Sequence, residues 1–382
     1  MRSIGHIKET SDKGVYRIVL SLGRDATGKR LRQWVTVRGN RRDAEKRLAE
    51  LQHEYNSGNY VKPGRMLVAK FLDRWLTDYA KPNLSPKGYE RYESIVRVHL
   101  KPALGNISLT QLKPEHIQAL YTTKLNAGLS AKTVRYYHVV LHKALQTALK
   151  WGLVVRNATD GADIPRNHQV EIRTWDETEI MRFLETARDS QYYALFHTAI
   201  FTGARRSELL GLRWRDVDFV FSQLQISRGL HQLTDGNYVF TQPKSAGSRR
   251  TIALSPSVIL TLQEHHDKMA MDRVIVGIPL SEEDLVFSQP DGRPFRPNTI
   301  SRAWRIIATK AGVSVIRLHD ARHTHASLML KQGVHPKVVS ERLGHSSIQI
   351  TLDTYSHVTP GLQEAAAKRF DEAIQKARVE IG

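Results

Sequence analysis

The chain is 382 residues long, more than one ordinary core needs, and this length predicts two or three domains. Lysine and arginine number 57 against 38 aspartate and glutamate, so the formal net charge is +19, which favours a polyanionic partner. The absence of cysteine excludes disulfides, thiolate metal sites and cysteine nucleophiles. Because the sequence contains neither a signal-peptide core nor a run of about 18 apolar residues, we expect an intracellular protein without a membrane partner.

The positive charge is concentrated in the first 165 residues, which hold 29 lysines and arginines against 14 acidic residues. The rest of the chain holds 28 against 24 and is nearly balanced. This asymmetry predicts DNA-gripping modules ahead of a larger, better balanced domain. A generally basic surface with no special partner is the alternative that the charge pattern leaves open.

The first 60 residues have the pattern of a small β-sheet with one helix. Residues 15–22 and 31–37 are rich in β-branched and aromatic side chains, which predicts a β-hairpin, with a short first strand near 3–8. Asn40 can cap a following helix. Because a two-stranded ribbon fits the major groove of DNA, the open sheet face is a candidate for base contacts, the alternative being a solvated structural face. Its candidate DNA-binding residues are Arg17, Arg30 and Arg32.

A linker at 60–64 is expected to lead into an all-α domain at 67–152. Ser85, which precedes a proline, and Ser130 supply start signals for two of its four predicted helices. Short connections favour a compact bundle. The candidate phosphate contacts of this bundle are Lys132, Arg135 and Lys143; scattered solubilising charge is the alternative. Residues 155–173 have little apolar periodicity and are predicted to form a second linker.

From residue 174 the chain alternates helical segments with a short β excursion. Thr174 is predicted to cap a helix whose first turn is rich in acids. Gly203 permits a tight turn into another helix. Arg205 is expected in the first turn of that helix, an unusual place for a cation because the positive end of the helix dipole repels it. A bound anion would explain Arg205, with Glu208 holding its guanidinium; an ordinary surface ion pair is the alternative.

Later segments add further polar candidates. Lys244 is expected near the tip of a hairpin between residues 237–241 and 250–254. His319 and Arg322, three residues apart, share a helix face. The histidines do not have the spacing of a His-Glu-x-x-His motif, and neighbouring arginines repel a cation, so we predict no metal site.

Four segments, taken in order, resemble the signatures of the tyrosine recombinases, the phage-integrase family. They read Thr-Gly-Ala-Arg-Arg-Ser-Glu-Leu, Pro-Lys-Ser followed by Arg-Arg-Thr-Ile, His-Asp-Ala-Arg-His-Thr-His-Ala, and Leu-Gly-His followed by Thr-Tyr-Ser-His. The resemblance is close over most of 174–358 and looser over 67–151. It implies six functional positions, all present here: Arg205, Lys244, His319, Arg322, His345 and Tyr355.

The fold class that the resemblance implies is α+β and multidomain. Residues 1–60 resemble the arm-type DNA-binding domain of many integrases, and 67–152 would be the core-type helical DNA-binding domain. Residues 174–358 would form a mostly α catalytic domain with a short β-sheet. The tail at 359–382 is expected to be amphipathic and to contact a neighbouring protomer, with a self-packed or frayed terminus as the alternative.

The implied chemistry is attack on a DNA phosphodiester, which accumulates negative charge on the nonbridging oxygens. Arg205 and Arg322 would clamp these oxygens with paired hydrogen bonds, and Tyr355 would be the nucleophile that forms a 3′-phosphotyrosine. Because the covalent bond conserves the energy of the phosphodiester, no ATP or other cofactor is expected, and the sequence has no P-loop motif.

Four further roles complete the implied site. Lys244 would protonate the departing 5′ oxygen, His319 would assist proton transfer, and His345 would donate a hydrogen bond to the phosphate. Glu208, and with less support Asp320, would hold the catalytic side chains from behind.

The implied function is site-specific recombination that integrates or excises a phage genome or another mobile element through a Holliday junction. The implied partners are double-stranded DNA and accessory DNA-bending and excision proteins. The chain is expected to be a monomer in free solution and to assemble as a homotetramer on paired DNA sites. The expected location is the cytoplasm of a bacterial host, on the nucleoid. The alternatives are a DNA-bound regulator of the same fold whose catalysis has lapsed and a type IB topoisomerase-like enzyme. A metal-dependent transposase or nuclease is disfavoured because no acidic triad stands out.

Overall fold

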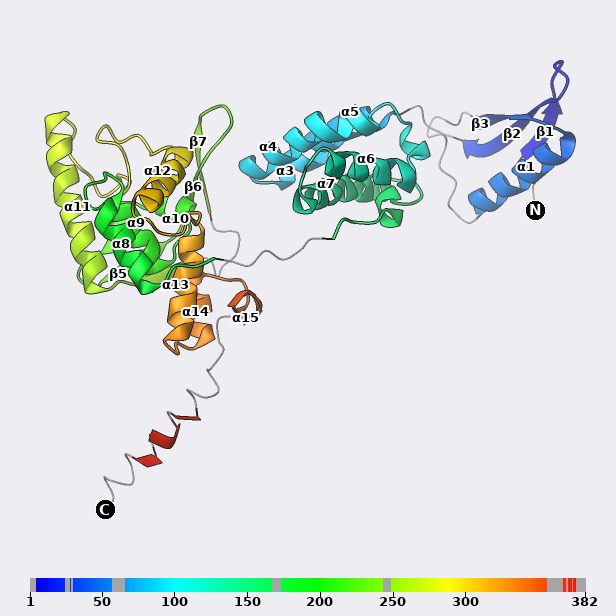
Figure 1. The fold of residues 1–382 in the computed structure, drawn as a ribbon. Coiled ribbons are helices and arrows are strands. Elements are labelled where there is room, and N and C mark those ends of the chain that lie inside the picture. Colours follow the sequence, from blue (N-terminus) through cyan, green and yellow to red (C-terminus); the bar gives the residue numbers. More distant parts are fainter. Residues whose placement is uncertain are drawn as a thin grey trace. The chain divides into compact units, whose positions relative to one another are not determined.

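The computed structural model describes residues 5–24, 28, 30–56, 66–166, 173–242 and 249–355, with short pieces of 367–375. The chain divides into two compact units, Met1–His168 and Gln169–Gly382, whose elements are labelled in Figure 1. The linker predicted at 60–64, Lys244 with its predicted hairpin tip, and most of the predicted tail lie outside the described residues.

The N-terminal unit begins with an antiparallel sheet in the order β1-β2-β3 (Figure 1). Its elements are β1 (Gly5–Glu9), β2 (Val15–Arg24), β3 (Arg30–Arg38) and the helix α1 (Arg41–Asn56). As predicted, Asn40 caps the helix, its side-chain oxygen accepting the Asp43 N–H at 2.9 Å. One sheet face buries Ile18 and Leu20 against Leu51 of α1.

The other face of this sheet carries the predicted DNA-binding arginines. Strand side chains alternate between faces, so Arg17 lies opposite the buried Ile18, and Arg30, Arg32 and Trp34 share one face of β3. Trp34 is 49% exposed, and the guanidinium of Arg17 lies 5.9 Å from its ring centre. The face is therefore basic and aromatic.

A helical bundle with its own core follows the sheet. Its elements are α2 (Val68–Trp75), η1 (Leu76–Ala80), α3 (Lys81–Asn83), α4 (Pro86–Ile95), η2 (Val96–Leu100), α5 (Lys101–Leu104), η3 (Leu109–Gln111), α6 (Pro114–Asn126) and α7 (Ala131–Lys150). The predicted caps are confirmed: the Ser85 and Ser130 hydroxyls each accept the N–H three residues on, at 3.3 Å.

Two π-helical turns join these segments into four continuous helices, the number predicted. The η1 turn comes just before Pro82 and the η2 turn just before Pro102. Proline lacks the N–H that an α-helix would use, and its ring clashes with the carbonyl four residues back. The wider π turn relieves this clash, so each helix continues through its proline.

Part of the second predicted linker is instead packed on the bundle. Residues Ala158–Gly161 form the short helix η4, and Asn157 accepts the Thr159 N–H at 3.1 Å. Ala158 and Ala162 are buried in the bundle core. The linker prediction for 155–173 is therefore wrong for this stretch, because two small alanines contribute to a core without showing a hydrophobic period.

The C-terminal unit is mostly helical with two small antiparallel sheets (Figure 1). Its helices are α8 (Glu177–Ala187), α9 (Tyr193–Thr202), α10 (Arg206–Leu210), η5 (Trp214–Asp216), α11 (Pro256–Ile275), α12 (Pro297–Lys310), α13 (Asp320–Lys331), α14 (Pro336–Leu343) and α15 (Ile348–Tyr355). Its strands are β4 (Val217–Asp218), β5 (Gln223–Ile226), β6 (Gly229–Gln232), β7 (Tyr238–Thr241) and β8 (Arg250–Ala253).

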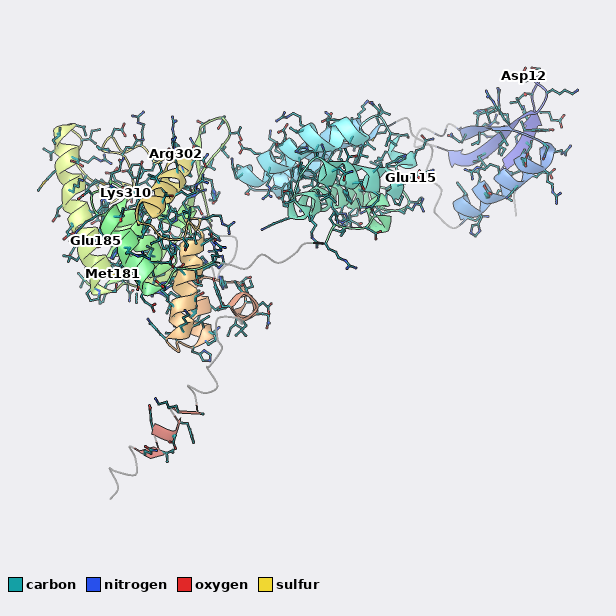
Figure 2. All side chains as sticks on the ribbon, viewed as in Figure 1. Asp12, Glu115, Met181, Glu185, Arg302 and Lys310 are labelled. Carbon is teal, nitrogen blue, oxygen red and sulfur yellow. The ribbon has the colours of Figure 1, made fainter. Side chains whose placement is uncertain are left out.

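Aromatic side chains fill the centre of this unit. The rings of Trp175 and Trp304 are stacked with centres 5.0 Å apart, and Phe183 lies 4.3 Å from Trp304. Phe183 belongs to α8 and Trp304 to α12. Figure 2 shows the outer faces of these two helices, where Met181 and Glu185 project from α8 and Arg302 and Lys310 from α12. Each helix thus buries one face and exposes the other.

Two local predictions in this unit are wrong. The cap of α8 is Asp176 rather than Thr174: its carboxylate accepts the Glu179 N–H at 2.7 Å while Glu179 accepts the Asp176 N–H. The predicted hairpin between 237–241 and 250–254 does not form, because β7 pairs with β6 and β8 pairs with β5. The turn at Gly236, with φ 91°, makes β6 the nearer partner of β7.

Among the described residues, no helix combines the length and hydrophobicity needed to cross a membrane.

Candidate active site

A cleft of about 610 Å³ in the C-terminal unit brings together residues that are far apart in the sequence. Its walls come from α10, the β6–β7 hairpin, the start of α13, the loop after α14, and α15. The predicted catalytic residues that line it are Arg205, His319, Arg322, His345 and Tyr355. The sixth, Lys244, lies outside the described residues, whereas Gln242, two residues before it, lines the cleft.

Two glycines place the helix ends that surround the arginines of the cleft. Gly203 ends α9 with φ 64°, and Gly344 ends α14 with φ 67°, both left-handed conformations that favour glycine. A Cβ on Gly203 would lie 2.7 Å from a methyl carbon of Leu343. A side chain at residue 203 would therefore have to displace side chains of α13 and α14, in addition to the strain of the positive φ.

Arg322 is held in the angle between these two helix ends. The side chain is almost fully buried, and its guanidinium donates to the Gly203 carbonyl at 3.0 Å and to the Leu343 carbonyl at 2.6 Å. Helix C-termini carry partial negative charge, which stabilises a buried cation. Burial, followed by repulsion from Arg205, lowers the pKa of Arg322 to about 9, so the side chain is protonated at neutral pH.

Arg205 is the N-cap residue of α10 and is tied to Glu208. Its main-chain N–H donates to one Glu208 carboxylate oxygen at 2.8 Å, and its guanidinium donates to the other at 2.6 Å. A further guanidinium N–H donates to the Gly344 carbonyl at 3.3 Å. The predicted local pair of Arg205 and Glu208 is therefore present, and it fixes the arginine at the edge of the cleft.

Glu208 also binds Arg250 of β8, which the sequence did not single out. Arg250 donates to the two carboxylate oxygens at 2.9 and 3.3 Å, and both side chains are buried. Burial raises the pKa of Glu208, but hydrogen bonds and charge from Arg250, and then from Arg205, outweigh it, so the pKa lies below its ordinary value. The carboxylate is therefore ionised at neutral pH and bridges two arginines.

His345 and His319 are neutral hydrogen-bond donors and acceptors in the cleft. Burial, followed by the charges of Arg322 and Arg205, lowers the pKa of His345 to about 4, and its Nδ1 lies 2.7 Å from the Thr351 hydroxyl. His319 reaches the surface of the cleft, yet desolvation and the charge of Arg322 also lower its pKa. Both rings can thus hydrogen-bond an anion without carrying a charge of their own.

Tyr355, at the end of α15, is 2% exposed and packs with Leu330 and Val339. Its hydroxyl lies 2.7 Å from Nδ1 of His323, a residue that sequence analysis missed. Burial raises the pKa of Tyr355 to about 12, although the charge of Arg322 opposes this effect. The sequence does contain a signal for His323: it lies four residues after the predicted site residue His319, so both side chains lie on the same side of one helix.

Asp320, predicted as a supporting residue, binds Arg317. It accepts the Arg317 N–H at 2.9 Å and two guanidinium N–H groups at 2.7 and 2.9 Å. The carboxylate stabilises the first turn of α13, where negative charge is favourable. Asp320 is not among the residues that line the cleft.

A second basic cleft of about 680 Å³ adjoins the first, because the two share lining residues at Arg228, Thr241 and Gln242. Its arginines are Arg213, Arg215, Arg228, Arg249 and Arg250. Arg213 and Arg215 both bind Glu283, and the guanidinium of Arg213 also lies 5.4 Å from the exposed ring of Phe240. The two clefts together form a continuous basic surface.

Within the described part of the chain, no group of three or more acidic or histidine side chains is placed to hold a metal ion. The residues that line the first cleft instead present several guanidinium groups, several imidazoles and the phenol of Tyr355. Guanidinium groups donate paired hydrogen bonds to phosphate oxygens and stay charged. This set of donors suits a phosphodiester that is attacked by an oxygen nucleophile.

Two family descriptions match the chain. The phage integrase family matches residues 172–361, and the N-terminal SAM-like domain of phage integrases matches residues 67–125. The chain therefore belongs to the phage integrase family of tyrosine recombinases, and its activity is site-specific DNA recombination. This finding confirms the recognition, the fold class and the enzyme class that the sequence motifs predict.

Relatives extend over nearly the whole chain. A "Tyrosine recombinase XerC-like" protein of Caldanaerobacter subterraneus is 28% identical over 94% of this chain and 96% of its own length. The "ICEBs1 integrase" of Bacillus subtilis is 26% identical over 95% of this chain and 98% of its own length.

Solved structures share the fold. The integrase of the Tn1549 transposon, solved with transposon right-end DNA, has a TM-score of 0.69 at 21% identity, over 80% of this chain and 99% of that one. A lambda integrase tetramer bound to a Holliday junction has a TM-score of 0.59 at 18% identity, over 92% of this chain and 97% of that one.

Proposed function

We propose that this chain is the integrase of a mobile element, which cleaves one DNA strand per protomer through a 3′-phosphotyrosine and exchanges strands through a Holliday junction. The observation that carries the proposal is the position of Arg205, Arg322 and Tyr355 around one cleft. The arginines would bind the nonbridging oxygens of the scissile phosphate, and Tyr355 would attack the phosphorus. Lys244 would protonate the leaving 5′ oxygen, and His345 would donate to the phosphate.

The wider DNA surface follows from the same reasoning. The basic face of β2 and β3 would bind arm-type sites, and Lys132, Arg135 and Lys143 of α7 would contact backbone phosphates at the core site. Lys132 and Arg135 are exposed. With 3.6 residues per turn, the side chains of Lys132, Arg135 and Lys143 all lie within roughly 80° of one another around the axis of α7. The solved structures with DNA support double-stranded DNA as the partner, and the lambda integrase tetramer on a Holliday junction supports four protomers on paired sites as the active assembly. The location that goes with this function is the nucleoid of a bacterial cell.

The test is covalent trapping on a nicked duplex from which the cleaved end diffuses away. We expect the wild-type protein to form an SDS-resistant adduct with the 3′ phosphate, and peptide mapping should place it on Tyr355. Because the arginines supply the charge that stabilises the transition state, the yield should be unchanged in EDTA. A wild-type protein that binds the site without forming any adduct would contradict the proposal and indicate the regulator with lapsed catalysis.

The topoisomerase alternative makes a different prediction about sites. A recombinase should give sequence-specific footprints and a four-protomer synapse on paired sites, whereas a type IB topoisomerase-like enzyme should relax supercoiled plasmid without either. The neighbouring basic cleft supports a long DNA contact, because it extends the catalytic cleft past Arg228.

Replacing Arg215 with glutamine is expected to weaken DNA binding at all sequences alike. Neutralising one phosphate contact reduces the slope of log binding constant against log salt concentration by about 0.9. Binding titrations at several salt concentrations measure this slope. The matched control is Arg302→Gln, because Arg302 is exposed on α12 and lines neither cleft (Figure 2). An Arg215→Gln slope equal to that of the control would remove the second cleft from the DNA path.

A further inference from the structure

The phenol of Tyr355 is withdrawn from solvent and bonded to one histidine. The side chain is 2% exposed, and its hydroxyl oxygen lies 2.7 Å from Nδ1 of His323. The two rings are 5.7 Å apart between centres and tilted by 53°. A nucleophile held this way is in direct contact with a group that can take its proton.

The direction of this hydrogen bond follows from the protonation states. A phenol whose pKa is raised to about 12 keeps its proton at neutral pH and is the donor. Desolvation, followed by the charge of His319, lowers the pKa of His323 to about 4, so the imidazole is neutral. Nδ1 therefore accepts the phenol hydrogen, and the ring carries its own hydrogen on Nε2.

Several charged or titratable groups face His323. From α13 and the segment before it, these are His319, Arg322, Arg317 and Asp320, of which only Asp320 favours the imidazolium. From the loop after α14 comes His345, and from α15 comes Tyr355 itself. The surroundings are therefore mainly cationic and keep His323 neutral before cleavage, so the lone pair of Nδ1 is available to the phenol hydrogen.

His319 occupies a different position from His323. Its ring meets the ring of His323 edge to face, with centres 5.5 Å apart. His319 lines the same cleft and is exposed there, so its ring can reach substrate. The two histidines are suited to different steps.

We propose that His323 is the proton acceptor for Tyr355 during DNA cleavage. The inference rests on the proposed function. As the bond between the phenol oxygen and phosphorus forms, the phenol proton moves to Nδ1 of His323 and the bond from phosphorus to the 5′ oxygen breaks. That oxygen takes a proton from the general acid assigned above to Lys244. In religation the attacking 5′ hydroxyl returns its proton to Lys244 and the imidazolium returns its proton to the departing phenolate, so both protons are restored.

The test is single-turnover cleavage by His323→Asn, since an asparagine amide can hydrogen-bond near the Nδ1 position but cannot take up a proton. We expect cleavage at pH 7 to slow by about 10²- to 10⁴-fold, the usual contribution of a general base. The rate should recover as the pH rises, because hydroxide then removes the phenol proton. DNA affinity should be unchanged.

The matched control is His138→Asn in the helical bundle. Nδ1 of His138 lies 2.8 Å from the hydroxyl of the buried Tyr121, so the same substitution disturbs an equivalent pair far along the chain. This variant should cleave at the wild-type rate on saturating DNA. Its thermal unfolding also calibrates how much stability such a pair contributes.

A substrate with sulfur in place of the scissile 5′ oxygen separates the two proton transfers. A thiolate leaves without being protonated, so this substrate should rescue a Lys244 variant but leave His323→Asn slow. Rescue of His323→Asn would assign the histidine to the leaving group and overturn the inference. A rate within twofold of the wild type, or a slow rate that does not recover with pH, would also overturn it.

The wild-type protein provides a readout that does not depend on how the variant folds. With the sulfur substrate, only the phenol proton is transferred during cleavage, so the reaction should be slower in D₂O than in water. Equal rates would count against His323 as proton acceptor. If the wild-type protein forms no adduct at all, the proposed function fails instead, which keeps the two failures distinct.

Discussion

The variant Tyr355→Phe is expected to fold and to bind DNA like the wild-type protein but to form no covalent adduct. The substitution removes only the hydroxyl that would attack phosphorus, while the ring keeps its contacts with Leu330 and Val339. The loss in cleavage should be on the order of 10⁶-fold, the scale on which removal of an enzyme's nucleophile acts. Adduct formation on the nicked duplex, separated under denaturing conditions, measures it.

A small loss of stability should accompany this large loss of activity. Without the hydroxyl, Nδ1 of the half-buried His323 loses its 2.7 Å partner, which costs at most about 1–3 kcal/mol, the range for a fully buried polar atom. The control Tyr121→Phe removes an equivalent hydroxyl, bonded to His138 at 2.8 Å in the bundle core. It should lower the thermal stability comparably and leave cleavage intact. Adduct formation by Tyr355→Phe at the wild-type rate would refute Tyr355 as nucleophile.

The local features of the fold were predictable because their signals lie within a few residues. Ser85 and Ser130 cap their helices through hydrogen bonds to N–H groups three residues on, and Asn40 does the same. The four helices of the bundle follow from periodic apolar residues, and the π turns before the prolines leave that number unchanged. The error at Thr174 is of the same local kind, since Asp176 is a stronger cap that was two residues away.

The errors in the β region have a different cause. Strands β5 to β8 are each only four residues long, so their partners depend on tertiary packing rather than on sequence pattern. A turn at Gly236 pairs residues 238–241 with β6, whereas the sequence pattern predicts a pairing with 250–254. Lys244 follows β7, and its role remains a prediction.

The site shows the same division between local and distant contacts. The pairing of Arg205 with Glu208 was predictable because the two residues are three apart on one helix. The buried ion pair of Glu208 with Arg250 joins residues 42 apart, and the bond of His323 to Tyr355 joins residues 32 apart. Motif resemblance brought Tyr355 and Arg205 to one site, but only the fold reveals which side chains hold them.

Glu208 is the residue whose replacement should most disturb the frame of the site. In Glu208→Gln, one carboxylate oxygen becomes an amide NH₂ that faces guanidinium donors, and the buried charge of Arg250 loses its counter-ion. Breaking one side of a buried ion pair costs about 3–5 kcal/mol, which corresponds to a decrease in Tm on the order of 10 °C for a domain of this size. Cleavage should also fall, because Arg205 loses one of its two hydrogen bonds to this side chain together with the charge that held its guanidinium.

The effect of Glu208 should depend on pH with a definite sign. Its pKa is lower in the folded protein than in the unfolded chain, so the ionised carboxylate stabilises the fold above the unfolded pKa, near 4.3. This stabilisation is lost as the pH falls through the folded pKa, where the carboxylate takes up a proton. The difference in Tm between wild type and Glu208→Gln should therefore be full at pH 7 and shrink below about pH 4.

Calorimetry of the full chain at pH 7 and below pH 4 measures the difference in Tm between wild type and Glu208→Gln. The unfolding transition of the C-terminal unit should shift, while that of the helical bundle should not. The control is Glu283→Gln, which removes an exposed carboxylate that also binds two arginines, Arg213 and Arg215. Exposed ion pairs contribute about 0–1 kcal/mol, so this variant should lose little stability. Equal Tm losses in the two variants would show that the number of arginine partners, rather than the burial of Glu208, sets the stability of this region.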